Sequence, residues 1–230
     1  MSEINHILDQ LYTLAAKNNL PGMARFGIET GGGRLGIAIP QLRMIAKATG
    51  RDHQLALALW NTGIPEARIL ASMVDDPAHV TSAQSDSWVH DFSSWDICDQ
   101  VCSNLFDKTP FAWEKIWEWA EDESEFVRRA GYVMIACLAV HDKGAPDASF
   151  TALFPVITSG VSDPRNFVRK AVNWAIRSIG KRNLALNKAA ITISEKILTI
   201  DDKTARWIAR DALRELKSEK VRERLRKKAK

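Results

Sequence analysis

A short sequence pattern recurs at a fixed spacing in the second half of the chain. The segment Phe126–Ala130 (FVRRA) returns 41 residues later as Phe167–Ala171 (FVRKA). A further step of 41 residues reaches Ile208–Ala212 (IARDA), which keeps an apolar residue, the arginine and the final alanine. A period of about 40 residues is typical of repeats in which each unit is a pair of helices. Such a unit cannot bury its apolar face alone, so the pattern predicts stacked units that share one core.

Apolar residues follow helical spacing elsewhere in the chain as well. They recur at intervals of three and four, as in Ile4, Ile7, Leu8, Leu11 and Leu14, and in Trp113, Ile116, Trp117 and Ala120. Proline and glycine separate segments of roughly 10 to 18 residues, which is the length of helices rather than strands. We therefore predict an all-α fold, a right-handed α-solenoid of HEAT-like helical repeats, as a single domain over residues 1–230. Its concave face is expected to bind an extended partner.

The N-terminus and the cysteines argue against a secreted or membrane protein. The segment Met1–Asn18 lacks both the basic start and the unbroken apolar run of a secretory signal, and no apolar stretch is long enough to span a bilayer. Three cysteines do not suggest a disulfide framework. Cys98 and Cys102 could share a metal ion, but no nearby histidine completes a tetrahedral site, which favours core packing. We expect a cytoplasmic protein without metal, organic cofactor or membrane partner.

The charge is distributed unevenly along the chain. Counted as Lys+Arg against Asp+Glu, residues 161–230 carry +12 and residues 1–160 carry −8. Clustered lysine and arginine gain affinity for a polyanion by releasing counterions from its phosphates. Half of the excess positive charge lies in the basic C-terminal tail, residues 217–230. This half would also be expected of a tail that is merely solvated and binds no polyanion. Lys181 and Arg182 lie before that tail, so nucleic acid is the partner that the charge favours.

One predicted helix carries a cationic stripe. Lys170, Trp174, Arg177 and Lys181 follow one another at intervals of four, three and four residues. A buried face would not hold three charges, so this stripe points to solvent or to an anion. Phosphate binding, with Trp174 against a base or sugar, is the functional interpretation. A solvated face with an incidental tryptophan is the alternative.

A second helix pairs an indole with a carboxylate. Trp95 and Asp99 are four residues apart, so they share one helical face. A carboxylate beside an indole makes a pocket wall suited to a cation. By spacing alone, the alternative is a core tryptophan next to a solvated aspartate.

Arg128 and Arg129 are neighbours that point about 100° apart on a helix, so they cannot serve one purpose. Arg128 occupies the repeat position shared with Arg169 and Arg210, which indicates a structural contact between repeats. Arg129 aligns with Lys170, the first residue of the cationic stripe, and is therefore predicted to face the anion.

Together these segments resemble the AlkD-like alkylpurine DNA glycosylases, whose repeats are HEAT-like. The resemblance covers roughly residues 5–215, and its most specific part is the Trp95-to-Asp99 segment followed by the Trp174-to-Arg177 stripe. The matching segments, in order, are Met23–Phe26, Pro40–Lys47, Leu59–Trp60 followed by Glu66, Trp95–Asp99, Arg129–Ala130, and Lys170–Ala171 with Trp174 and Arg177.

The resemblance implies a role for each matching residue. Asp99 would be the catalytic carboxylate, and Trp95 and Trp174 would flank the damaged nucleotide. Phe26 stands where the family has a tyrosine, so a hydroxyl contact to DNA is absent there. The remaining implied DNA contacts, including those of the stripe, are Arg129, Lys170, Arg177, Lys181, Arg43, Lys47 and Phe26.

The implied reaction is hydrolysis of the N-glycosidic bond of 3-methyladenine or 7-methylguanine in double-stranded DNA, without flipping the base and without a cofactor. A purine alkylated at N3 or N7 is already positively charged, so it leaves as a neutral base and needs no general acid. An ionised Asp99 could then stabilise the cationic sugar and position water. We expect a monomer. The alternatives are a non-catalytic HEAT-repeat module that binds DNA structure and, less favoured, a protein-binding scaffold.

Overall fold

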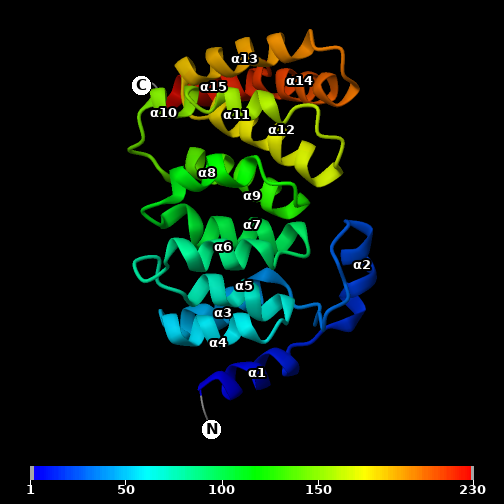
Figure 1. Cartoon of the computed structure of the whole chain (residues 1–230), viewed down its shortest axis with the longest axis vertical. Helices are drawn as coiled ribbons and strands as arrows, with labels where there is room; N and C mark the ends of the chain where they lie inside the picture. The colour runs from blue at the N-terminus through cyan, green and yellow to red at the C-terminus, as the bar shows by residue number, and fades with distance from the viewer. Residues whose placement is uncertain (1–2, 229–230) are drawn as a thin grey trace. The chain divides into compact units, whose positions relative to one another are not determined.

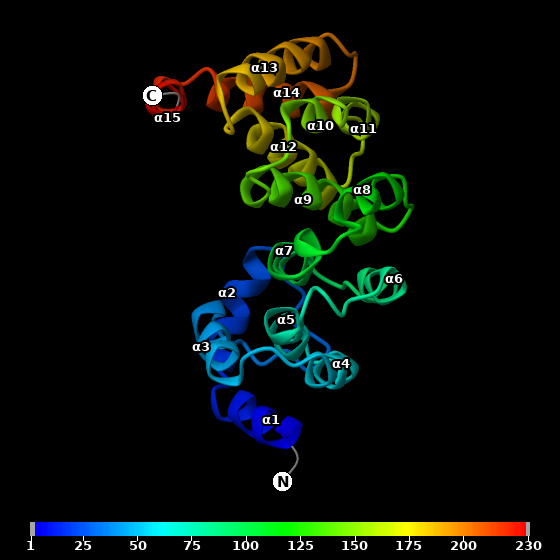
Figure 2. The same cartoon turned by 90° about the vertical axis from the view of Figure 1, so that its left-hand side faces the viewer.

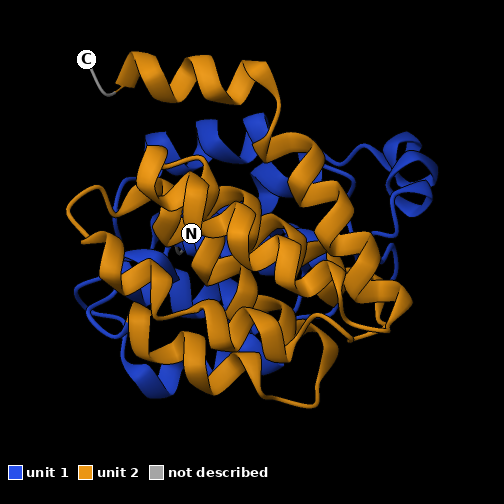
Figure 3. Ribbon diagram, turned by 90° about the horizontal axis from the view of Figure 1, so that it is seen from above, with its two compact units in different colours: residues 1–111 blue, residues 112–230 orange. Residues whose placement is uncertain are grey.

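The computed structural model describes residues 3–228, and every regular element in this range is helical. This confirms the predicted all-α class (Figures 1 and 2). The helices form two compact units, residues 1–111 and 112–230 (Figure 3). That the whole chain acts as one continuous domain stays a prediction.

The first unit includes the helix that carries Trp95 and Asp99. Its elements, with η for a 3-10 helix, are α1 (Glu3–Thr13), η1 (Lys17–Asn19), α2 (Leu20–Arg25), α3 (Ile39–Thr49), α4 (His53–Asn61), α5 (Pro65–Val74), α6 (Ser82–His90), α7 (Trp95–Asn104) and η2 (Phe106–Lys108). Within this unit α5 packs against α3, α4 and α7.

The second unit contains the 41-residue repeat. Its elements are α8 (Ala112–Ala120), α9 (Glu125–His141), α10 (Asp147–Thr151), α11 (Phe154–Ser159), α12 (Asn166–Gly180), α13 (Leu184–Leu198), α14 (Lys203–Leu216) and α15 (Glu219–Lys228). The pattern falls on α9, α12 and α14, and α12 packs against both of the other two. The alanine that ends each copy, Ala130, Ala171 and Ala212, is fully buried. Stacking of repeated helices is thereby confirmed within this unit.

A carboxylate ties the first two copies of the repeat together. Asp163, in the turn before α12, accepts hydrogen bonds from the Arg128 guanidinium at 3.1 Å and from Arg165 Nε at 3.0 Å. Arg128 also donates to the carbonyl oxygen of Glu121, at the end of α8. The predicted contact of Arg128 between repeats is confirmed.

Most of the C-terminal basic tail is helical rather than frayed. Residues 219–228 form α15, whose Val221 and Leu225 are buried and which contacts α13 and α14. Ala229 and Lys230, the last two residues of the predicted tail, lie outside the described residues. Val221 and Leu225 lie four residues apart, so α15 has one packed apolar face, and its basic side chains lie on the other face.

A buried carboxylate holds the loop between α2 and α3 in place. Glu66 on α5 is 1% exposed, and its carboxylate accepts the backbone N–H groups of Leu35 and Gly36 at 3.0 and 2.7 Å. A buried carboxylate is tolerated only when it is hydrogen-bonded in this way. Gly36 has φ of 80°, and a Cβ there would lie 2.4 Å from the carbonyl oxygen of Ala16, so glycine is required.

The closest approach of α8 and α9 predicts a sensitive position. A Cβ at Gly131 would lie 2.5 Å from the backbone nitrogen of Ala120, so Gly131→Ala must push the two helices apart. We expect a loss of about 1–3 kcal/mol in the free energy of unfolding, measured by urea denaturation. Gly22→Ala is the matched control, because Gly22 is also helical and has open space around it. An equal effect at both positions would contradict the packing described here.

A second prediction concerns pH. Burial opposes ionisation of Asp163, but hydrogen bonds from Arg165 and Arg128 hold its pKa below the ordinary 3.8. A carboxyl group with a lowered pKa stabilises the fold fully above its unfolded-state pKa, and this contribution disappears as the pH falls through the folded-state pKa. Asp163→Asn should therefore cost about 1–3 kcal/mol at neutral pH, and progressively less at acid pH values below the ordinary pKa of 3.8.

The control for this prediction is Asp201→Asn, because Asp201 pairs with Arg206 while its side chain is 99% exposed. Its effect should be near zero at neutral and at acid pH, since exposed ion pairs contribute little. Urea unfolding of parent and variants across the acid range measures the difference. A cost of Asp163→Asn that does not change with pH would show that the carboxylate charge is not what stabilises the turn.

Candidate nucleic-acid interface

The first turn of α7, which carries Trp95, is held by the loop that follows α2. Ser94 precedes the helix in extended conformation and is 1% exposed. Its hydroxyl accepts the backbone N–H of Glu29 at 3.2 Å. Arg34 forms two hydrogen bonds to the carboxylate of Asp96, at 2.8 and 3.2 Å, and is itself 5% exposed. We call this set of contacts the α7 clamp.

The indole of Trp95 belongs to the same clamp. Its Nε1 donates a hydrogen bond to the carbonyl oxygen of Phe26 at 3.1 Å, and the residue is partly exposed. The interpretation of Trp95 as a core tryptophan is therefore wrong. The fixed indole leaves part of its surface available to a ligand.

Asp99 lies one turn further along α7 and is also partly exposed. Its neighbours Cys98 and Cys102 are fully buried beside Val101, which confirms that these cysteines are core residues. The two thiols of α7 therefore face the core, whereas the carboxylate of Asp99 does not. Asp99 is not a core side chain, which its predicted role requires.

A small cavity of about 170 Å³ opens beside the clamp. Its walls include Trp95, Asp96, Gln100 and Glu66, but not Asp99. The cavity therefore lies beside the first turn of α7 and is not a pocket around Asp99, the predicted catalytic carboxylate.

The other predicted contacts of the first unit lie on α3 and at the end of α2. Arg43 and Lys47 are exposed one turn apart on α3, and neither has an ion-pair partner among the described residues. Met44 is 65% exposed beside them, and Phe26 is 75% exposed. The structure leaves all of these side chains accessible to a partner.

The cationic stripe lies on α12 as predicted, but two of its cations already have a partner. Lys170 is exposed, whereas Trp174, Arg177 and Lys181 are partly buried. Arg177 and Lys181 both form ion pairs with Glu215 on α14. Burial opposes ionisation of Glu215, yet hydrogen bonds from Lys181 and Arg177 keep its pKa below the ordinary value. Phosphate binding by these two cations would have to compete with Glu215.

Arg129 differs from its expected place. It is 5% exposed, and its guanidinium donates a hydrogen bond to the carbonyl oxygen of Phe167 on α12 at 2.5 Å. The expectation of an open, anion-facing position came from alignment with Lys170, which is exposed. The two differ because Arg129 lies under the next helix of the stack. Its contact with DNA stays a prediction.

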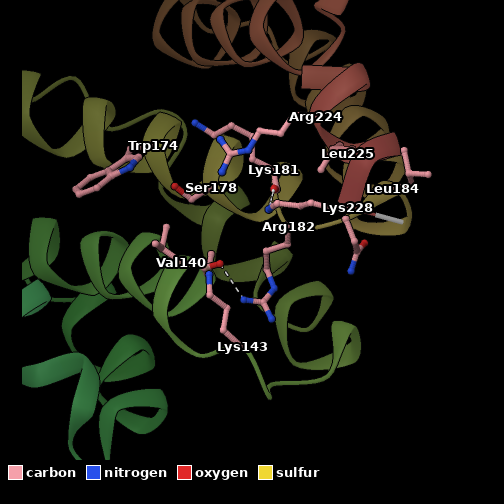
Figure 4. Close-up of a pocket in the computed structure, with 12 residues that line it drawn as sticks. Val140, Lys143, Trp174, Ser178, Lys181, Arg182, Leu184, Arg224, Leu225 and Lys228 are labelled. Atoms are coloured by element: carbon pink, nitrogen blue, oxygen red, sulfur yellow. Dashed lines mark hydrogen bonds between the residues drawn. The ribbon is translucent and has the colours of Figure 1, made fainter. Parts of the chain in front are cut away.

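Sequence reasoning missed a basic pocket of about 600 Å³ in the second unit (Figure 4). We call it the C-terminal pocket. Its lining comprises Ala139, Val140, Lys143, Trp174, Ser178, Lys181, Arg182, Asn183, Leu184, Arg224, Leu225 and Lys228. The charge of residues 161–230 was the available signal, but only the fold places α15 beside the ends of α9 and α12.

None of the described helices has the length and apolar content needed to cross a membrane.

Comparison with known proteins identifies the fold and the family. No curated protein sequence matches the chain. One solved structure is similar over 97% of this chain and 96% of its own, with a TM-score of 0.80 and 16% identity. It is described as a new family of proteins related to the HEAT-like repeat DNA glycosylases, with affinity for branched DNA structures. This likeness shows that the fold is HEAT-like.

Two further solved structures are less similar. Cex1p matches 98% of this chain and 43% of its own, with a TM-score of 0.48 and 13% identity. A designed armadillo repeat protein matches 77% of this chain and 92% of its own, with a TM-score of 0.35 and 14% identity.

A family model described as DNA alkylation repair enzyme matches residues 7–216. That range takes in the α7 clamp, the cationic stripe and all three copies of the 41-residue repeat. The chain belongs to the DNA alkylation repair enzyme family.

Proposed function

We propose that this protein is a DNA glycosylase that hydrolyses the N-glycosidic bond of cationic alkylated purines, 3-methyladenine and 7-methylguanine. The observation that carries the proposal is the first part of α7, where a partly exposed indole and a partly exposed carboxylate lie one turn apart on a helix fixed by the α7 clamp. Membership of the DNA alkylation repair enzyme family supports it.

The chemistry requires few protein groups. The bond from C1′ of the sugar to the alkylated base breaks, and its electron pair neutralises the positive charge of the departing purine. Water adds to C1′ and loses a proton, which leaves an abasic sugar. Asp99 stabilises the cationic sugar electrostatically and orients the water. The face of each flanking indole, Trp95 and Trp174, stabilises positive charge by about 0.5–2 kcal/mol.

Binding of double-stranded DNA is proposed for the cationic side chains, with the protein acting as a monomer and without flipping the base. Arg43 and Lys47 are accessible and have no ion-pair partner in the part of the chain that the structure describes, so they can meet phosphates without first breaking an ion pair. Lys170 is equally accessible. Arg177 and Lys181 must exchange the Glu215 carboxylate for phosphate, which makes their contribution conditional on close approach of the DNA.

A second candidate is a module that binds DNA structure without catalysis. It is favoured by the solved protein of similar fold that is described as having affinity for branched DNA structures. Release of free base from methylated duplex DNA distinguishes the two candidates. Released 7-methylguanine and 3-methyladenine support the glycosylase. Tight binding of branched DNA with no released base would support the binding module instead.

The central prediction concerns Asp99→Asn. The variant should lose base release, because the carboxylate charge is gone, but keep or improve DNA affinity, because a negative charge near phosphates is removed. Chromatography of bases released from methylated duplex DNA measures the first effect, and fluorescence anisotropy with labelled duplex measures the second. Asp9→Asn is the matched control, since Asp9 is exposed on α1. Excision by Asp99→Asn at the parent rate would show that the mechanism is wrong.

The ion pairs of Glu215 lead to another prediction. Glu215→Gln removes the competitor of Arg177 and Lys181, so duplex affinity at low salt should rise severalfold. Glu195→Gln is the control, because Glu195 is exposed and pairs with Lys217, and it should change affinity much less. Anisotropy titrations at two salt concentrations measure both. If Glu215→Gln lowers thermal stability and leaves affinity unchanged, the two cations of α12 are structural.

A further inference from the structure

The C-terminal pocket brings together cations from three separate elements. Lys143 follows α9, Lys181 and Arg182 follow α12, and Arg224 and Lys228 lie on α15. Figure 4 shows Trp174 at one side of the pocket and Arg224 and Lys228 at the other. No aspartate or glutamate lines it.

The cations of this pocket divide into paired and unpaired groups. Arg182 is structural, because its guanidinium donates to the carbonyl oxygen of Ala139 at the end of α9 and lies 4.1 Å from the ring centroid of Phe150. Lys181 is shared with Glu215. Lys143 and Arg224 are exposed and have no carboxylate partner within residues 3–228.

Several like charges lie close together in this pocket. Burial and the neighbouring Arg224, Lys143 and Arg182 lower the pKa of Lys228. The fold nonetheless keeps these side chains together, because Val221 and Leu225 of α15 are buried and the helix packs against α13 and α14. The positive charges of Lys143 and Arg224, which no carboxylate within residues 3–228 pairs with, make the pocket attractive to an anion.

The volume of the C-terminal pocket and its uncharged lining residues indicate which class of anion it can bind. A volume of about 600 Å³ is far larger than an inorganic anion requires and is typical of sites for organic groups. Trp174 offers a flat surface for a base or sugar, while Val140 and Leu184 give apolar contact. A phosphate carried on a nucleoside combines these properties, whereas an acidic peptide would leave the indole without a matching group.

We infer that the C-terminal pocket is a subsite for a backbone phosphate of DNA, in which Lys143 and Arg224 neutralise the phosphate and Trp174 contacts the adjoining nucleoside. The inference rests on the proposed function for its choice of DNA as the polymer. It assigns α15 to substrate binding, although α15 lies beyond residues 7–216, which the family model matches.

The test is the salt dependence of binding to undamaged duplex DNA. The double variant Lys143→Gln/Arg224→Gln should reduce the slope of log K against log salt by about 0.9, the value for one neutralised phosphate. The control is Lys188→Gln/Arg222→Gln, which removes the same charge from exposed positions of the same unit that do not line this pocket. The control should keep the parent slope. Both variants should unfold at the parent temperature, because all four side chains are exposed.

Several outcomes would overturn the inference. A parent-like slope for Lys143→Gln/Arg224→Gln, or an equal reduction in both variants, would show that the pocket does not hold a DNA phosphate. Calorimetric titration with inorganic phosphate alone forms a second arm. Saturable binding that the double variant loses while its DNA slope stays unchanged would assign the pocket to a small phosphate compound. Equal competition by a polyglutamate peptide would assign it to an acidic protein.

Base release is measured on the same preparations, so that the two proposals fail separately. If the parent releases no base but the slope changes as expected, the pocket is supported and the glycosylase proposal fails. If the parent releases base and the double variant binds like the parent, the glycosylase proposal is supported and the pocket fails.

Discussion

Carboxylates with little solvent exposure fix loops and turns to the helices, and the positions of the candidate site residues depend on them. Glu66 is satisfied by backbone N–H groups of the loop before α3, Asp96 by Arg34, and Asp163 by Arg128 and Arg165. A carboxylate removed from water is costly unless its oxygens are hydrogen-bonded. An arrangement of the helices shifted by one turn would leave each of these acids unsatisfied, so few alternative packings compete with this one.

Arginine has two distinct uses in this protein, and the net charge does not separate them. Arg128, Arg129 and Arg182 lie against backbone carbonyls or a buried carboxylate of a neighbouring helix or turn, where they hold the stack together. Arg43 and Arg224 project from helix surfaces. A count of positive charge therefore overstates what is available to a polyanion, and the ion pairs of Glu215 reduce it further.

The sequence predicts elements of this fold well where the information is local or periodic. The 41-residue repeat and the three-four spacing of apolar residues were sufficient for the helical class and for the stacking of α9, α12 and α14. Arg128 was assigned correctly as a contact between repeats, whereas Arg129, predicted to face an anion, is buried against α12. The burial of Arg129 was not predictable, because it depends on the carbonyl of Phe167 in another helix.

The same limit applies to the site. The partly exposed positions of Trp95 and Asp99 agree with their helical spacing, but the support of the first turn of α7 by Phe26, Glu29 and Arg34 is a long-range feature without a local signal. The C-terminal pocket was missed for that reason too. Its charges were visible in the sequence as a basic tail, whereas the convergence of three helix ends is a property of the folded unit.

The α7 clamp makes the candidate site depend on residues far ahead of it in the chain. Arg34 and Asp96 are 62 positions apart, and the intervening α3 to α6 must be in place before they meet. A fragment that began at α3 would retain all of α7 but leave the hydroxyl of Ser94, the carboxylate of Asp96 and the indole N–H of Trp95 without these partners. The candidate site therefore depends on the loop between α2 and α3 as directly as on α7 itself.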